Sequence, residues 1–390
     1  MRCYIYIWLF FFLLSCNSKT KDLNNQYFLL PSDQYVSFPI PDNTALPYDG
    51  IKTFNVDGKE YLAFDGSDHR SLYIYDIQSK NLVKHILYEA EGDEGIKGIS
   101  EFYIEDFDHI YLSSYYPVIF RTDTAGHILQ KINYAHTTDT PSIELRSTSS
   151  IMGSIVVLGQ QIYIPTNINP AFGNELIEKS KVGVVIDTVS HSVEQLPLGF
   201  PPLITYQDIG TGTGSGYGCY YNRCFDGNSF VYGFLYNDLM YKTSIDHKKV
   251  IRKKVKSHYA PNIDVFHIKE TSSFNEHLKI EAETSIYGDC VYDPYHKVYY
   301  RFAYPSSELE KNDSYVEILR NGRKQPSIMI LNEDLEILGE TLLPEFTYAS
   351  RAYFVREDGL YLSVSHFKRE DYSEDTLRFQ RLELVTNKDK

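Results

Sequence analysis

A tyrosine sits second in a short apolar, strand-like run at six places along the chain. These six residues, called the index tyrosines below, are Tyr61, Tyr111, Tyr163, Tyr232, Tyr299 and Tyr361. Consecutive index tyrosines are separated by 50, 52, 69, 67 and 62 residues. A unit that recurs at this period and contains strands is typical of a β-propeller or a similar repeat array. The repeat therefore constrains the architecture strongly, although it carries no chemistry of its own.

Each repeat holds further apolar runs around its index tyrosine. A run and a short turn precede the tyrosine, a third run that usually ends on an acid follows it, and a tight turn leads to a fourth run. Acids, Asn, Ser and Gly at these turns are what hairpins require. The sequence thus predicts an all-β, six-bladed propeller with four antiparallel strands in each blade. The sixth repeat has only three runs, so we expect the N-terminal run at residues 34–39 to complete it and close the ring.

Composition fits one long domain over residues 27–390. Apolar residues make up 43 % of the 390, and the 34 Tyr and 22 Phe are residues that strands prefer. The net charge of −14 opposes binding to nucleic acid and to anionic lipid, since both need a basic surface. The one basic run, at residues 248–256, alternates like an edge strand, where lysines block aggregation.

The N-terminus has the features of an export signal. The apolar run at residues 4–14 is too short to span a bilayer as an ordinary helix but suits a signal-peptide core within residues 1–15. It ends in Leu13-Leu14-Ser15-Cys16, which looks like a bacterial lipobox, and the polar residues 16–26 then form a tether. The sequence predicts a lipid anchor on Cys16 and a cell-envelope location, on the periplasmic or the cell-surface side. A plain secretory signal with a coincidental Cys is the alternative.

Cofactor and metal motifs are weak in this chain. Cys219, Cys224 and Cys290 lack the second ligand pair of a zinc site, so we interpret them as buried thiols or at most one bridge. The glycine-rich stretch at residues 210–218 lacks the lysine of a phosphate-binding loop. The sequence has neither an HExxH motif nor a Gly-x-Ser-x-Gly elbow. We therefore predict neither a cofactor nor a metal ion.

One junction between repeats resembles a known family. Residues 91–102 (EGDEGIKGISEF) lead into a strand, an acidic turn and Ile110-Tyr111-Leu112. This resembles the blade junction of NHL-like six-bladed propellers. With the lipobox, the length and the tyrosine-rich strands, the whole chain resembles the uncharacterised six-bladed propeller lipoproteins of Bacteroidetes, which form domain-of-unknown-function families. The resemblance implies the fold and the envelope location, and that family has no established catalytic residues.

Long connections place the candidate site on one face. The loops from second to third strands and between blades are long, and in a propeller both classes emerge on the same side, called the long-loop face below. The predicted innermost strands begin with Glu101, Arg223, Asp289 and Arg351, which suit binding of a carboxylate or sulfate or else pair with one another across blades. A further set follows the second strands onto this face, as a glycan surface or as loop filler: Tyr115, Tyr116, Asn167, Asn169, Tyr236, Arg301, Tyr304 and His366.

Two functions from different classes follow from these observations. The first is a monomeric binding or scaffold module that presents its long-loop face to a glycan, a peptide or a protein partner. The second is a polysaccharide hydrolase or lyase with its site at the mouth of the central channel, an analogy from the fold alone. A deep channel in which His366, or an acid and an arginine, is left unpaired by its neighbours would favour the enzyme, whereas a shallow ring of self-paired residues would exclude it.

Overall fold

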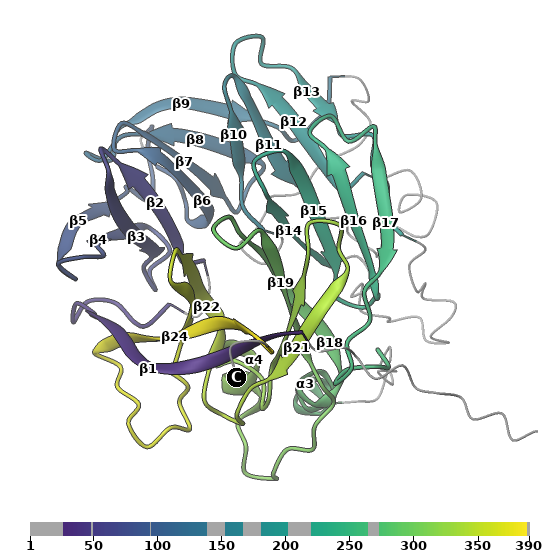
Figure 1. The fold of residues 1–390 in the computed structure, drawn as a ribbon. Helices are drawn as coiled ribbons and strands as arrows, with labels where there is room; N and C mark the ends of the chain where they lie inside the picture. The colour runs from purple at the N-terminus through teal and green to yellow at the C-terminus, as the bar shows by residue number, and fades with distance from the viewer. Residues whose placement is uncertain are drawn as a thin grey trace, which may run out of the picture.

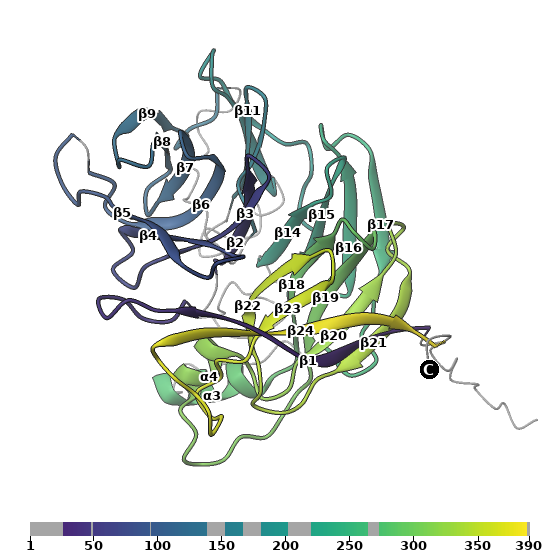
Figure 2. The same cartoon turned by 60° about the vertical axis from the view of Figure 1, so that its left-hand side comes forward.

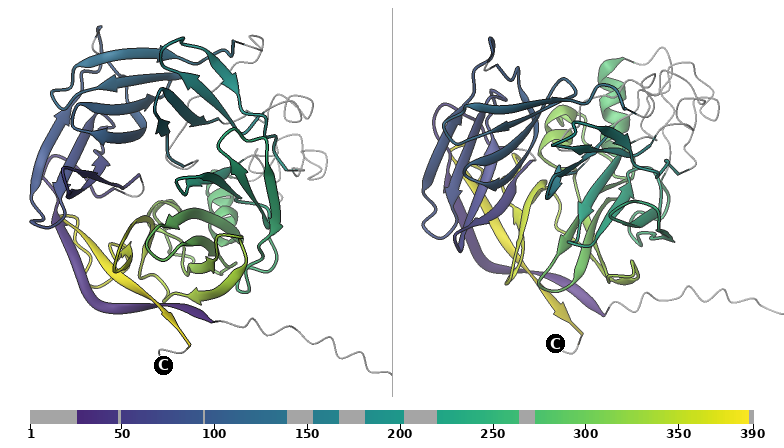
Figure 3. Two further views of the ribbon diagram at one scale, coloured as in Figure 1. Left: turned by 45° about the horizontal axis from the view of Figure 1, so that its top comes forward. Right: turned by 90° about the horizontal axis from the view of Figure 1, so that it is seen from above.

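Six four-stranded antiparallel sheets surround a central axis, as Figure 1 and the left panel of Figure 3 show. The computed structural model describes residues 26–47, 50–93, 95–138, 153–166, 181–201, 220–263 and 273–387. In each sheet the strands follow one another in chain order from the axis outward, except in the sheet that joins the two ends of the chain. The predicted six-bladed propeller is confirmed.

Blades are numbered here in chain order. Blade 1 contains β2 (Lys52–Val56), β3 (Lys59–Asp65), β4 (Ser71–Asp76) and β5 (Leu82–Leu87), and blade 2 contains β6 (Ile99–Asp106), β7 (His109–Ser114), β8 (Val118–Thr122) and β9 (Ile128–Asn133). Blade 3 contains β10 (Val156–Leu158), β11 (Gln161–Pro165), β12 (Gly183–Asp187) and β13 (Val193–Gln195), and blade 4 contains β14 (Tyr221–Phe225), β15 (Ser229–Phe234), β16 (Leu239–Ser244) and β17 (Val250–Lys254). Blade 5 contains β18 (Ile286–Asp293), β19 (Val298–Tyr304), β20 (Ser327–Leu331) and β21 (Ile337–Leu342), and blade 6 contains β22 (Ala349–Arg356), β23 (Gly359–Ser363), β24 (Thr376–Thr386) and β1 (Tyr27–Pro39).

The N-terminal strand closes the ring as predicted. β1 pairs antiparallel with β24, from Tyr27 opposite Thr386 to Pro39 opposite Thr376, and Figure 2 shows the two strands side by side. Phe38 of β1 is fully buried, and its ring packs edge-on against Phe379 of blade 6 and Tyr75 of blade 1. The strand begins earlier than predicted, at Tyr27, and its pairing is irregular between Pro31 and Tyr35. Closure therefore joins blades 6 and 1 through both hydrogen bonds and core packing.

The index tyrosines occupy equivalent places in all six blades. Each lies on the second strand of its blade, namely β3, β7, β11, β15, β19 or β23, and each is buried. Their rings fill the spaces between neighbouring sheets, as when Tyr163 of blade 3 packs against Phe230 of blade 4. The index tyrosines thus belong to the core, because aromatic rings suit the flat, half-buried surface of a strand.

Acids at the ends of the third strands serve the turns. The Asp76 carboxylate accepts a hydrogen bond from the backbone N–H of Ser79 at 2.7 Å, and Asp187 accepts from Ser190 in the same way at 2.7 Å. A short acceptor here fixes the reversal into the fourth strand, which explains the recurring acid. In blade 4 the basic run forms β17, the outermost strand, as its lysines predicted.

Two short helices lie on the long-loop side of blades 5 and 6. Helix α3 (Phe274–Glu283) belongs to the connection between blades 4 and 5, and α4 (Tyr315–Asn321) to the connection from β19 to β20. Ser273 and Glu276 form a capping box that starts α3. Ala282 of α3 packs with Tyr315 and Ile318 of α4, and Figure 1 shows the helices next to each other. We call these two helices the helical cap. No helix in the described part of the chain is long and apolar enough to cross a membrane.

Candidate functional site

The innermost strands enclose a cavity of about 500 Å³ along the propeller axis. One polar residue from each blade stands at its long-loop end, on an innermost strand or, in blade 3, two residues before it. Each lies nine or ten residues before the index tyrosine of its own blade. This set, called the channel belt, consists of Lys52, Glu101, Ser154, Arg223, Asp289 and Arg351. All but Glu101 line the cavity directly.

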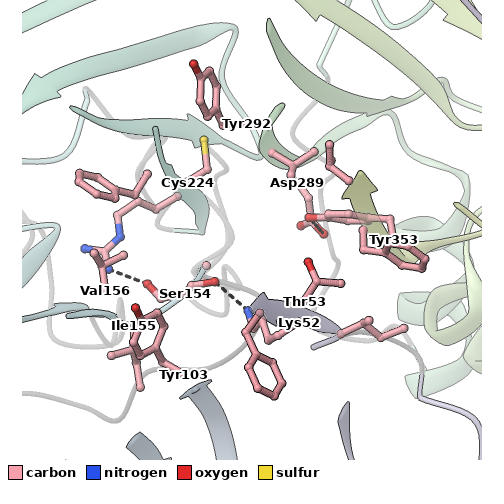
Figure 4. A pocket seen from close by; sticks show the side chains of 18 of the residues that line it. Lys52, Thr53, Tyr103, Ser154, Ile155, Val156, Cys224, Asp289, Tyr292 and Tyr353 are labelled. Carbon is pink, nitrogen blue, oxygen red and sulfur yellow. Dashed lines mark hydrogen bonds between the residues drawn. The ribbon is translucent and has the colours of Figure 1, made fainter. Parts of the chain in front are cut away.

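Lys52 connects three blades at the belt. Its Nζ lies 2.9 Å from Oε1 of Glu101 and donates a hydrogen bond to Oγ of Ser154 at 2.8 Å. Figure 4 shows the Lys52 ammonium pointing at Ser154 across the cavity wall. Glu101 is fully buried, whereas the side chain of Lys52 remains 21 % exposed toward the cavity. The buried carboxylate therefore holds the ammonium ion in place, and part of that cation stays accessible from the channel.

Asp289 is held from both sides. Oδ1 accepts a hydrogen bond from Asn222 of blade 4 at 3.2 Å, and Oδ2 accepts one from the hydroxyl of Tyr353 of blade 6 at 3.2 Å. Burial, with the Asp289 charge next, raises the pKa of Tyr353 well above its usual range. The phenol therefore stays protonated and continues to donate to the carboxylate.

Arg223 points into the interface between blades 3 and 4. Nη2 donates to the carbonyl oxygens of Ser154 at 2.8 Å and Tyr163 at 3.0 Å. Its guanidinium lies 4.8 Å from the centre of the Phe230 ring, a cation–π contact. Together with the ion pair of Lys52 and the contacts of Asp289, this means that neighbouring blades share the polar groups of the belt. The partners in these contacts are Lys52, two backbone carbonyls, Asn222 and Tyr353.

Two cations of the belt belong to neighbouring blades. Arg351 lies on β22 of blade 6, and Lys52 lies on β2 of blade 1, the neighbouring blade in the closed ring. The belt carries three cations and two acids, although the chain as a whole has a net charge of −14. Like charges repel more strongly in a partly enclosed site than in water. With three cations and two acids, the belt keeps an excess of one positive charge, although Lys52 is paired with Glu101.

The opposite end of the cavity is rich in aromatic side chains, with Asn55 and Glu60 beside them. Phe54, Tyr103, Phe225, Tyr292 and Tyr295 line it where the innermost strands turn into the second strands. Figure 4 shows Tyr103 and Tyr292 on the wall of the cavity. The channel therefore changes from charged to aromatic along its length, and a molecule inside it would have a defined orientation.

Several predicted surface residues lie inside the fold. Arg301 is fully buried in the middle of β19, and His366 is fully buried beside the helical cap, where its ring stacks on Phe367. Tyr236 and Tyr304 are also buried, and the hydroxyl of Tyr304 meets that of Ser350 at 2.9 Å. The expectation that these four side chains project from the long-loop face is corrected. β19 runs to Tyr304, Tyr236 packs in the same buried cluster as Tyr304, and His366 is hydrogen-bonded to Gly322 at the end of α4. Asn167, Asn169, Cys16 and Cys219 lie outside the described residues.

Tyr115 and Tyr116 do lie on the surface, in the connection from β7 to β8. They are 52 % and 55 % exposed, and we call the pair the tyrosine platform. The ammonium of Lys97 lies 5.1 Å from the centre of the Tyr116 ring, and the ring of His69 meets Tyr115 edge-on. The Tyr115 ring also passes so close to Gly98 that a Cβ there would meet it at 2.4 Å. The platform is thus held in shape by its neighbours while both rings remain accessible.

Sequence reasoning missed four polar residues of the channel. They are Lys52, Ser154, Asn222 and Tyr353. The spacing of nine or ten residues before each index tyrosine would have found the first two. Asn222 and Tyr353 act through contacts between blades that no spacing within one repeat reveals.

Fold and channel together define a six-bladed β-propeller whose polar belt is bonded across its blades. A family model described as a domain of unknown function (DUF4221) matches residues 26–342, and the chain belongs to this family. The chain is similar to the crystal structure of a DUF4221 family member from Bacteroides vulgatus, with 20 % identity, a TM-score of 0.76, and coverage of 93 % of this chain and 99 % of that one.

A second similar structure is that of a putative exported protein from Bacteroides fragilis. The two chains share 9 % identity with a TM-score of 0.50, over 93 % of this chain and 96 % of the other. At these identities the two structures support the fold alone. No curated protein matches the sequence.

Proposed function

We propose that this protein is a non-catalytic binding module of the cell envelope, which holds an acidic glycan at the long-loop end of its channel. The observation that carries the proposal is the pair of neighbouring belt cations, Lys52 and Arg351, on the wall of a cavity of about 500 Å³. A cavity of this size holds one or two sugar rings, and a guanidinium binds a carboxylate or sulfate in a bidentate way.

The tyrosine platform supports a glycan over a peptide as the ligand. Tyr115 and Tyr116 lie in a connection of the second-to-third class, so they share the long-loop face with the belt. Flat aromatic rings offer a stacking surface to the apolar face of a sugar, and Lys97 beside them adds a donor for hydroxyl groups. A chain of sugars that enters the channel with its acidic end would then contact both features.

The state of the belt acids favours binding over catalysis. A hydrolase or lyase needs an acid or base that reaches the substrate. Glu101 is buried against Lys52, and Asp289 accepts hydrogen bonds from two neighbouring blades, so both carboxylates serve as acceptors within the wall. His366, the histidine considered for that role, is enclosed beside the helical cap. The enzyme therefore remains the second candidate, without an observation in its favour.

The envelope location is part of the same proposal. The lipobox ending at Cys16 supplies an anchor, and the similar protein from Bacteroides fragilis is described as putatively exported. An anchored propeller would present its long-loop face to polysaccharide at the membrane surface. We propose that it acts there as a monomer and without nucleic acid, because nucleic-acid binding needs an extended basic surface and the one basic run of the chain is the edge strand β17.

The charge of Arg351 is expected to be needed for binding. We expect Arg351→Gln to weaken binding of a uronate-containing or sulfated oligosaccharide about tenfold or more, because a charge-assisted hydrogen bond is lost. Arg356→Gln is the matched control, since Arg356 ends the same strand but is not among the residues that line the cavity, and it pairs with Glu60 at 2.8 Å. Titration calorimetry with acidic oligosaccharides and their neutral analogues measures the effect. Equal binding of both analogues, or equal loss in both variants, would contradict the proposed function.

A second expectation concerns the tyrosine platform. Tyr116→Ala should weaken binding of the same oligosaccharide about fivefold, because ring stacking is lost. Tyr295→Ala is the matched control, because Tyr295 is similarly exposed, at 50 %, but lies at the aromatic end of the channel. We expect that variant to bind as the unchanged protein does. If only Tyr295→Ala weakens binding, the ligand enters from the other end and the long-loop face is not the site.

A further inference from the structure

Two thiols face each other across a blade boundary in the channel wall. Cys224 on β14 of blade 4 and Cys290 on β18 of blade 5 have their sulfur atoms 3.7 Å apart, and both line the cavity. Each directly follows a belt residue, Arg223 in one case and Asp289 in the other. The two cysteines therefore hold equivalent positions on the innermost strands of neighbouring blades.

Asn222 fixes this arrangement. Its Oδ1 accepts a hydrogen bond from the backbone N–H of Cys290 at 3.0 Å, and its Nδ2 donates to Asp289 at 3.2 Å. One side chain on β14 thus holds two consecutive residues of β18. Because Asn222 and Cys224 are two apart on a strand, they point to the same side, toward blade 5. The meeting of the thiols follows from the register of the two strands.

We propose that Cys224 and Cys290 form a disulfide that joins blades 4 and 5 when the exported chain meets a disulfide donor. The sulfurs need to approach by about 1.7 Å to reach the bond length of a disulfide, a movement within the reach of side-chain rotation. The envelope of a bacterium permits such bonds, whereas the cytosol does not. This inference stands on the geometry of the thiols and is independent of the ligand.

The two electrons released when this disulfide forms are taken up by the donor, which is itself a disulfide and is reduced to two thiols. The thiolate of Cys224, which is the more exposed of the two, attacks one sulfur of the donor and releases the first donor thiolate. The thiolate of Cys290 then attacks the Cys224 sulfur of the mixed disulfide and releases the second. Two cysteines lose two electrons and two protons, and the donor disulfide becomes two thiols.

The bond would stabilise the ring beside the belt. Its ends are 66 residues apart in sequence, so it would restrict a long loop of the unfolded chain. For a chain of this size we expect reduction to lower the unfolding temperature by roughly 5 °C. The link would also fix Arg223 and Asp289, the neighbours of the two cysteines, relative to each other.

Peptide mapping tests the proposal directly. The full chain is exported to a bacterial periplasm, blocked with an alkylating agent without reductant, digested and analysed by mass spectrometry. We expect one linked peptide pair containing Cys224 and Cys290, in the unchanged protein and in Cys219→Ser alike. A second arm reduces the protein, adds oxidised glutathione and follows the return of the same pair.

The unfolding temperature provides a second measurement. Reductant should lower it by roughly 5 °C in the unchanged protein and in Cys219→Ser, and leave it unchanged in Cys224→Ala. The proposal is overturned if both cysteines are found alkylated in the protein blocked without reductant, and are again found alkylated when a separate, reduced sample is blocked after treatment with oxidised glutathione. It is equally overturned if Cys219 is the partner of either cysteine.

Discussion

Replacing Arg301 with methionine is expected to lower the free energy of unfolding by about 4 kcal/mol or more. Arg301 reaches from β19 of blade 5 into blade 4, where its guanidinium donates four hydrogen bonds to backbone carbonyls. The acceptors are Asn237 at 2.8 Å, Val255 at 2.9 Å, Phe234 at 3.0 Å and Asp238 at 3.4 Å. Methionine keeps the side-chain length and volume approximately but leaves these buried carbonyls without their charged donor.

The guanidinium also lies 3.6 Å from the centre of the Tyr287 ring. Burial lowers the pKa of Arg301 to about 10, so the side chain still carries its charge at neutral pH. Lysine would keep the charge but not the planar fork that spans several acceptors. We therefore expect the free energy of unfolding of Arg301→Lys to lie between those of Arg301→Met and the unchanged protein.

Arg252→Met is the matched control for Arg301. Arg252 is also a strand arginine over a tyrosine, 5.1 Å from the centre of the Tyr241 ring, but it lies exposed on the edge strand β17. Replacing Arg252 with methionine should lower the free energy of unfolding by less than about 1 kcal/mol. Urea unfolding of the three variants measures these differences. Equal stability of Arg301→Met and Arg252→Met would refute the structural role of the buried guanidinium.

Arg301 illustrates where sequence reasoning reached its limit. The period of the index tyrosines was enough to predict six blades, their second strands and the closing strand, since each depends on local strand patterns that repeat. The same repeat placed Glu101, Arg223, Asp289 and Arg351 on the innermost strands. Whether a particular side chain faces the channel or a neighbouring blade depends on the end of each strand and on tertiary packing. A pattern within one repeat does not contain that information.

The helical cap shows a second limit. Its two helices are 10 and 7 residues long and lie in connections that interrupt the repeat. Short helices depend on tertiary packing, which here joins α3 to α4 and covers His366. A Ser and a Glu three residues apart, such as Ser273 and Glu276, do not by themselves distinguish a helix from a loop when no longer apolar period follows. His366 consequently looked like a surface residue at the end of a strand.

Acid should destabilise this protein through two buried histidines. His366 donates from Nε2 to the carbonyl of Gly322 at 3.2 Å, and its Nδ1 accepts from the backbone N–H of Lys368 at 3.2 Å. His247 donates from Nδ1 to the carbonyl of Ile245 at 2.8 Å, and its Nε2 accepts from the hydroxyl of Tyr232 at 2.6 Å. Burial lowers the pKa of each histidine to about 4, from 6.5. The folded chain thus keeps both rings neutral under conditions where the unfolded chain protonates them.

The direction in which the free energy of unfolding changes with pH follows from proton binding. Between pH 6.5 and 4 the unfolded chain holds more protons on these histidines, so stability rises with pH across this window and falls on acidification. Each histidine contributes about 3 kcal/mol that is present above pH 6.5 and lost by pH 4. At pH 5 the two together should already have cost about 4 kcal/mol relative to pH 7.

Urea unfolding between pH 7 and pH 5 measures this loss. In His366→Gln, whose amide can replace both hydrogen bonds without titrating, we expect the loss to be about half as large. His127→Gln is the matched control, because the side chain of His127 is 72 % exposed and should leave the loss unchanged. The contacts give the physical reason for His366: a proton on Nδ1 would face the N–H of Lys368, and two donors would then meet in a buried site. If His366→Gln loses as much stability as the unchanged protein, the acid sensitivity originates elsewhere in the fold.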